Sequence, residues 1–166
     1  MYLSPNTNSF LSSNNSLPNF GIDTKNMVDS LKLLLSMEYT LYVKTQNYHW
    51  NITGFSFSSL HKLLSKQYLT SSTFIDRIAE QIRKYGYPSP GSMYEFLSLQ
   101  QNIVEAPGLI LDQNVAINDL MMSNETIIRY INELNVYEMD LATQNLLGEI
   151  LDVHMKNSWM LRSHLI

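Results

Sequence analysis

Residues 23–51 read DTKNMVDSLKLLLSMEYTLYVKTQNYHWN, and this stretch decides the fold. Asp23 is a good helix cap, and apolar residues then recur at helical spacing with no Gly or Pro before Gly54. The apolar positions are Met27, Leu31, Leu34, Leu35, Leu41, Tyr42 and Tyr48. The pattern predicts one helix of about 27 residues.

The rest of the chain continues in helical periods. A second long helix follows a turn at residues 51–58 and ends at Gly86, before Pro88. Residues 87–111 are interrupted by Pro and Gly, so that only residues 93–101 can form a short helix within a long crossover. Two further helices are predicted at residues 112–135 and 140–164. This connectivity predicts an all-α fold, a ferritin-like four-helix bundle with a short helix between helices two and three.

Length and composition limit the function. The 166 residues suit one core at residues 23–166, preceded by an uncharged arm rich in Asn and Ser at residues 1–22. A net charge of −4 is the wrong sign for broad electrostatic binding to nucleic acid. Because the chain has no Cys, a metal must be held by His, Asp or Glu. No apolar run could span a membrane, and the first cation is Lys25, so we expect a cytoplasmic protein.

Four polar residues could form a metal site. His49 and His61 flank the first turn, and Asp76 and Glu80 lie one helical turn apart. The 15 residues from His61 to Asp76 span about 22 Å of helix, which is too far for one subunit. A twofold-related partner could bring the carboxylates to the histidines, and two imidazoles with two carboxylates would balance the charge of Fe²⁺. Hydrogen-bonded structural histidines and a solvated helix face are the alternatives.

Several segments carry a family resemblance. The segments YHWNITG (residues 48–54), LHKL (60–63) and IDRIAEQIR (75–83) resemble the Dps family of mini-ferritins (DNA-binding proteins from starved cells). The segments DLATQNLL (140–147) and WMLR (159–162) also look like that family, so the resemblance covers residues 23–166. The intervals of 12 residues from His49 to His61 and 27 residues to Asp76 are its most specific part.

The resemblance implies a function and an assembly. It implies a dodecameric shell that oxidises Fe(II), preferably with hydrogen peroxide rather than dioxygen, and stores ferric mineral. The ferroxidase ligands would be His49 and His61 of one subunit with Asp76 and Glu80 of another. Trp50 would be the aromatic residue that takes up a stray oxidising equivalent, with packing at the interface as the alternative.

The sequence departs from the family pattern at three places. Ser65 stands where the family usually has an acidic ligand, so we expect a weaker second iron position and reduced ferroxidase activity. Gln81 stands where Arg is common, which should alter the support of the carboxylates. The family's acidic threefold pore maps onto Asp140, residue 145, which is Asn, and Glu149. A weaker iron-entry pore is expected; helix capping by Asp140 and solvation of Glu149 are the alternative.

DNA binding is the activity for which the family is named, and it usually depends on a cationic tail. The N-terminal arm has no cation and the sequence stops shortly after Arg162, so we do not expect direct DNA binding. Binding that is bridged by Mg²⁺ or assisted by a partner is the alternative. The leading hypothesis is a cytoplasmic ferroxidase. The alternatives are a DNA-associated or structural shell with an impaired centre, which could be nucleoid-associated, and a metal-free bundle. His154 and the methionines are interpreted as core residues without chemistry.

Overall fold

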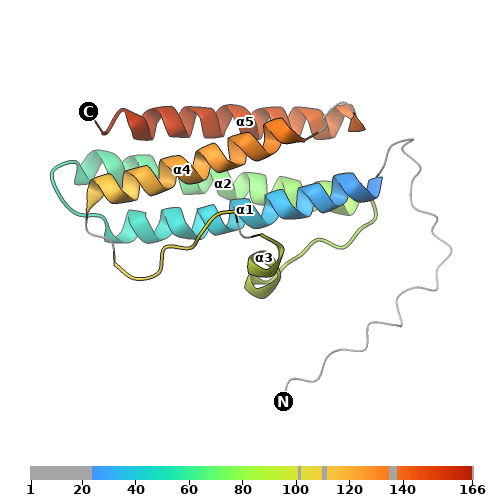
Figure 1. The fold of residues 1–166 in the computed structure, drawn as a ribbon, viewed down its shortest axis with the longest axis horizontal. Helices are drawn as coiled ribbons and strands as arrows, with labels where there is room; N and C mark the ends of the chain where they lie inside the picture. Colours follow the sequence, from blue (N-terminus) through green and yellow to red (C-terminus); the bar gives the residue numbers. More distant parts are fainter. Residues whose placement is uncertain (1–23, 101, 110–111, 135–137, 166) are drawn as a thin grey trace, which may run out of the picture.

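A computed structural model describes residues 24–100, 102–109, 112–134 and 138–165. Four long helices lie side by side and a short fifth helix lies beside α1 (Figure 1). The helices are α1 (Thr24–Asn51), α2 (Phe57–Lys84), α3 (Met93–Leu99), α4 (Gln113–Glu133) and α5 (Leu141–Arg162). The all-α prediction is confirmed, and the described residues contain no strand. The expected arm at residues 1–22 lies outside the described residues.

Contacts between the helices define the topology. Residues early in α1 contact residues late in α4, and the same reversed order holds for α2 and α5, so both pairs are antiparallel. The contacting pairs are Ser30–Tyr130 and Lys44–Asp119 for the first, and Arg77–Glu149 and Gln81–Thr143 for the second. Since α1 and α2 are joined by a short turn, α1 and α5 run one way and α2 and α4 the other. This is the topology of a bundle with one long crossover.

The predicted apolar stripe of α1 forms one wall of the core. Val28, Leu31 and Leu34 have no exposed surface, and they pack with buried residues of the other helices such as Ile78 and Ile127. Tyr42 differs from the prediction because it is only half-buried. Its ring instead makes edge contacts with the rings of Tyr39 and Tyr68 at the side of the bundle.

The helix starts follow from their capping residues. The Asp112 carboxylate accepts hydrogen bonds from the backbone N–H groups of Asn114 and Val115, which would otherwise lack partners at the start of α4. Asp140 caps α5 in the same way through Ala142 and Thr143. Both helices therefore begin one residue after the predicted position, because the predicted first residue is the cap.

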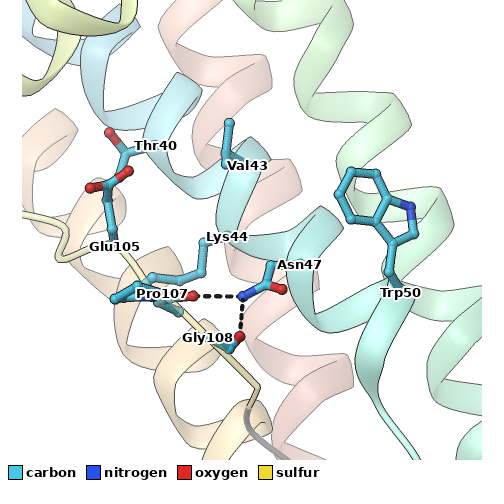
Figure 2. Close-up of a pocket in the computed structure, with 9 residues that line it drawn as sticks. Thr40, Val43, Lys44, Asn47, Trp50, Glu105, Pro107 and Gly108 are labelled. Atoms are coloured by element: carbon cyan, nitrogen blue, oxygen red, sulfur yellow. Dashed lines mark hydrogen bonds between the residues drawn. The ribbon is translucent and has the colours of Figure 1, made fainter.

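The crossover is fastened along α1. Gln100 donates to the Thr40 hydroxyl at 2.8 Å and also bonds both backbone groups of Ile103. Further along, the Asn47 amide donates to the carbonyls of Ala106 at 2.6 Å and Gly108 at 3.2 Å (Figure 2). Between the crossover and α1 lies an open cavity of 320 Å³. No helix in the described part of the chain is both long and apolar enough to cross a membrane.

Candidate metal centre

The turn between α1 and α2 brings the two predicted histidine ligands together. Gly54 has φ +112°, a left-handed conformation that residues with a side chain rarely adopt. A Cβ atom at this position would also lie 2.9 Å from the Gln113 side chain. The chain therefore reverses within a few residues, and His49 in the last turn of α1 faces His61 in the first turns of α2.

The two imidazole rings are stacked and tied to each other's backbone. Their centroids are 3.8 Å apart, and the ring planes differ by 22°. His49 Nδ1 lies 2.9 Å from the His61 carbonyl oxygen, and His61 Nδ1 lies 2.9 Å from the His49 carbonyl oxygen. Because a carbonyl can only accept, each Nδ1 must carry its proton. Within the described residues no hydrogen bond reaches either Nε2, so both lone pairs remain available for a metal.

Electrostatics favours the neutral, metal-binding form of His49. Burial lowers the pKa of His49, and the charge of a protonated His61 lowers it further. The hydrogen bond to the His61 backbone has the opposite effect and raises the pKa, but the net shift is downward. The His49 side chain is 8% exposed. Each imidazole also contacts an aromatic ring. The centroid of the Tyr68 ring lies 5.2 Å from that of His49, and the centroid of the Phe57 ring lies 5.1 Å from that of His61.

The predicted carboxylates lie elsewhere in the subunit. Asp76 and Glu80 are exposed on α2, and within the described residues neither forms an ion pair. The described part of the chain contains no group of three His, Asp or Glu that could hold a metal. One subunit thus supplies a pair of histidines and, about 22 Å along α2 from His61, a pair of carboxylates. It does not bring the four together.

Trp50 and Ser65 complete the predicted site residues. The Trp50 side chain is 66% exposed and stands at one end of the cavity beside the crossover (Figure 2). Ser65 is half-buried, one turn after His61, and lines a surface groove that also includes Lys62 and Lys66. The position that would need an acidic iron ligand therefore has a hydroxyl beside two cations.

Both predicted pore acids have partners within the subunit. Asp140 accepts from the N–H groups that start α5 and from the Thr143 hydroxyl at 2.7 Å. Glu149 accepts from Arg77 at 2.6 Å, and this hydrogen bond is the main reason why the pKa of Glu149 is lowered. Less of their charge is available to attract Fe²⁺ than if they were unpaired.

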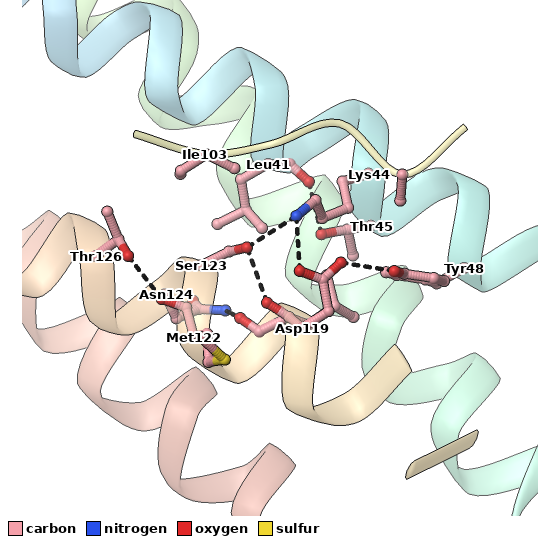
Figure 3. A network of polar contacts seen from close by, with 12 residues as sticks. Leu41, Lys44, Thr45, Tyr48, Ile103, Asp119, Met122, Ser123, Asn124 and Thr126 are labelled. Atoms are coloured by element: carbon pink, nitrogen blue, oxygen red, sulfur yellow. Dashed lines mark hydrogen bonds and ion pairs between the residues drawn. The ribbon is translucent and has the colours of Figure 1, made fainter. Parts of the chain in front are cut away.

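A polar network lies behind His49 that the sequence reasoning missed. Lys44 is buried, and its ammonium group donates to Asp119 at 2.9 Å and to Ser123 at 3.2 Å (Figure 3). Tyr48 donates to the other Asp119 oxygen at 2.6 Å. Burial and the interaction with Asp119 raise the pKa of Tyr48. The network holds the last turns of α1 against α4 and so fixes the backbone on which His49 is placed.

A second missed group lies deeper in the core. Glu38 and His154 are 0% and 1% exposed, and Glu38 Oε1 lies 2.6 Å from His154 Nε2. Asn124 donates to the Leu120 carbonyl, which turns its own oxygen toward His154 Nδ1 at 2.8 Å. His154 therefore donates to Asn124 through Nδ1, and its Nε2 faces Glu38 Oε1. The signal in the sequence was the position of Glu38 within the apolar stripe of α1.

The amino-acid sequence is similar to those of known proteins. Residues 28–166 match the family described as the ferritin-like domain. The chain is 32% identical over 152 residues to an uncharacterized low temperature-induced protein of Nostoc sp., with 87% of this chain and 84% of that protein covered. It is also 32% identical over 145 residues to DNA protection during starvation protein 2 of Deinococcus radiodurans, covering 86% of this chain and 60% of that protein.

Solved structures agree with the fold. The crystal structure of antigen TpF1 from Treponema pallidum has a TM-score of 0.81 at 28% identity and covers 86% of this chain and 92% of that one. The crystal structure of Dps92 from Deinococcus radiodurans has a TM-score of 0.80 at 30% identity and covers 85% of this chain and 86% of that one.

Proposed function

Because the chain belongs to the Dps family of ferritin-like proteins, we propose that it is an iron-storing ferroxidase. It oxidises Fe(II), with hydrogen peroxide preferred over dioxygen, and stores ferric iron inside a cytoplasmic shell. Iron is the substrate and the stored product. The observation that carries the proposal is the stacked pair of His49 and His61, whose Nδ1 atoms are both occupied by backbone carbonyls while both Nε2 atoms remain available.

His49 and His61 are preorganised to bind a metal ion. The reciprocal hydrogen bonds set the tautomer of each ring, so neither imidazole must reorganise its protons when Fe²⁺ binds. The lowered pKa of His49 reduces competition from protons. A purely structural pair would make the same backbone hydrogen bonds, so it is the two available Nε2 atoms that favour metal binding.

The carboxylates of a second subunit complete the centre. Asp76 and Glu80 are exposed and have no ion-pair partner among the described residues, as expected of ligands that await a partner's histidines. A twofold axis that places them beside His49 and His61 makes two equivalent centres at once. Two neutral imidazoles and two carboxylates then give each centre a charge that balances one Fe²⁺.

Exposed apolar surface favours assembly. Monomeric soluble proteins rarely expose large contiguous apolar patches. Here α3 exposes Met93, Tyr94, Leu97 and Leu99, the start of α2 exposes Phe57, and the end of α1 exposes Trp50. Burial of such surfaces between subunits supports the proposed dodecamer, in which Trp50 would lie near a centre and could take up an unpaired oxidising equivalent. Asp140 and Glu149 are proposed to line a weakly acidic iron-entry pore.

Ser65 limits the centre. Peroxide accepts two electrons when its O–O bond breaks, so two Fe(II) ions must each supply one. With Ser65 in place of an acid, the second ion binds weakly and the rate is reduced. The same observation favours a second candidate, a structural or DNA-associated shell with an impaired centre.

Iron oxidation by the purified assembly tests the proposal. Wild-type protein is expected to oxidise Fe(II) with peroxide faster than buffer alone, and His49→Ala/Asp76→Ala should lose this activity. A control variant, Glu133→Ala/Asp152→Ala, removes two exposed carboxylates outside the centre and should keep it. Unchanged oxidation in the first variant would show that the centre is placed wrongly, and oxidation no faster than in buffer for wild type would favour the impaired shell.

Assembly is tested separately. Light scattering should give about 230 kDa, the mass of twelve 19.2 kDa chains. A monomer or simple dimer without iron uptake would favour a metal-free bundle.

A further inference from the structure

A groove between α2 and α5 lies apart from the histidine pair and has its own chemistry. It has a volume of 110 Å³, and its apolar walls are Leu63, Val153 and Met160. Polar groups enter it from both helices: Lys66 and Gln67 from α2, and Lys156 and Asn157 from α5. An enclosed apolar surface with a few convergent polar groups is the usual form of a small-ligand site. We call this the α2/α5 groove.

The groove is cationic on an acidic protein. The chain has a net charge of −4, yet Lys66 and Lys156 stand on opposite walls of the groove. Within the described residues neither lysine forms an ion pair with a carboxylate. Lys62 lies one turn before Lys66 and adds to the local positive potential. Two lysines without counter-charges favour an anionic ligand.

A buried donor without a partner provides an independent observation. Gln67 is 5% exposed, and its Nε2 has no hydrogen-bond partner in the described structure. An unpaired buried N–H group is costly, and most such groups in folded proteins find an acceptor. Since Gln67 lines the groove, rotation of its terminal amide would let Nε2 donate to a ligand oxygen there. The missing partner is therefore an acceptor, which agrees with the charge of the two lysines.

From these observations we infer that the α2/α5 groove binds a tetrahedral oxyanion, with inorganic phosphate as its ligand. The ammonium groups of Lys66 and Lys156 approach from opposite helices, and the Gln67 amide donates between them. The groove has a volume of 110 Å³, which accommodates one small ion. The phosphodiester of a nucleic acid has the same chemistry, and the experiments below distinguish it from free phosphate.

Phosphate binding to the metal-free assembled protein tests the inference independently of iron oxidation. Isothermal titration with inorganic phosphate in a phosphate-free, low-salt buffer should show saturable binding of about one ion per subunit. Lys66→Gln/Lys156→Gln should weaken binding by about tenfold or more. The control Lys25→Gln/Arg129→Gln removes the same charge elsewhere and should bind like wild type. Weak, non-saturating uptake that is the same in all three proteins would overturn the inference.

A Gln67→Leu variant tests whether the Gln67 side-chain amide binds phosphate. Phosphate should bind several-fold more weakly, while the thermal midpoint without phosphate should stay the same or rise, because an unpaired buried donor has been removed. A lower midpoint with unchanged phosphate affinity would show a purely structural role and contradict the inference. If free phosphate does not bind, and retardation of a DNA fragment is lost in Lys66→Gln/Lys156→Gln but kept in the control, the groove serves nucleic acid and the inference is wrong.

Discussion

Replacement of His154 by leucine should strongly destabilise the bundle, although it inserts an apolar residue into an apolar core. Glu38 and His154 are almost completely buried and lie 2.6 Å apart. Glu38 Oε2 already has no partner among the described residues. His154→Leu would remove the partner of Oε1 as well, and it would also leave the Asn124 side-chain oxygen without its donor. The carboxyl group would then be buried without any hydrogen bond from a described residue.

The expected loss can be given a magnitude. If the pair is ionised, removal of one partner from it costs about 3–5 kcal/mol of unfolding free energy. For a domain of this size, 1 kcal/mol changes the thermal midpoint by about 2–4 °C, so the midpoint should fall by about 6–20 °C. Replacement of both residues, Glu38→Leu/His154→Leu, should restore most of this loss, because no polar group of the pair is left unsatisfied.

Urea unfolding followed by circular dichroism measures the change in unfolding free energy, and heating measures the shift of the thermal midpoint, both at one protein concentration for all variants. Arg162→Met is the matched control, because its ion pair with Glu125 lies at the surface and should contribute about 0–1 kcal/mol. A loss below about 1 kcal/mol for His154→Leu would refute the reasoning. So would a double variant that is no more stable than the single one.

Three further predictions concern the surroundings of the centre. Lys44→Met leaves Asp119 without its ammonium partner and should lower the unfolding free energy by roughly 1–3 kcal/mol in the same urea assay. Gly54→Ala forces a side chain into φ +112° and should cost about 1–3 kcal/mol; a neutral result would show that the turn can relax. Arg77 lowers the pKa of Glu149 below its ordinary 4.5 in the folded state, so their contribution to stability is present above pH 4.5 and is lost as the pH falls through the lowered value. In Arg77→Gln, NMR titration should show the pKa of Glu149 rising toward 4.5; no change would mean that the pair does not persist in solution.

The helices could be predicted because their signals are local. Apolar spacing predicted α1 almost residue by residue. The predicted starts of α4 and α5 were one residue early because Asp112 and Asp140 are the caps, although capping too depends only on the next three residues. The short α3 follows a capping box in which Ser92 and Glu95 bond each other, and this signal is also local. Such features need no knowledge of the neighbouring helices.

The polar interior could not be predicted in the same way. Glu38 and His154 are 116 residues apart, and Lys44 and Asp119 are 75 apart, so their pairing depends on the register between helices. Apolar periodicity places a helix face toward the core but does not fix how far one helix slides along another. Glu38 could have been flagged as a charge on the buried face of α1, whereas its partner could not have been identified.

The histidine site lies between these cases. The spacing of His49 and His61 around a short turn predicts that they are close, and the structure places their rings 3.8 Å apart. The hydrogen bonds from each Nδ1 to the other histidine's carbonyl could not be predicted from the sequence, because they depend on the conformation of the turn that Gly54 permits. The distance along α2 separates the carboxylates from the histidines, so the proposed centre requires a second subunit.

Complementation between defective subunits tests this central claim most directly. One variant, His49→Ala/His61→Ala, keeps the carboxylates, and the other, Asp76→Ala/Glu80→Ala, keeps the histidines; each alone should oxidise Fe(II) no faster than buffer. When equal amounts are co-assembled, half of the twofold pairs are mixed and each mixed pair has one intact centre of two. Peroxide-dependent Fe(II) oxidation should therefore return to about one quarter of the wild-type rate. No recovery in a correctly assembled mixed shell would contradict a centre shared between subunits.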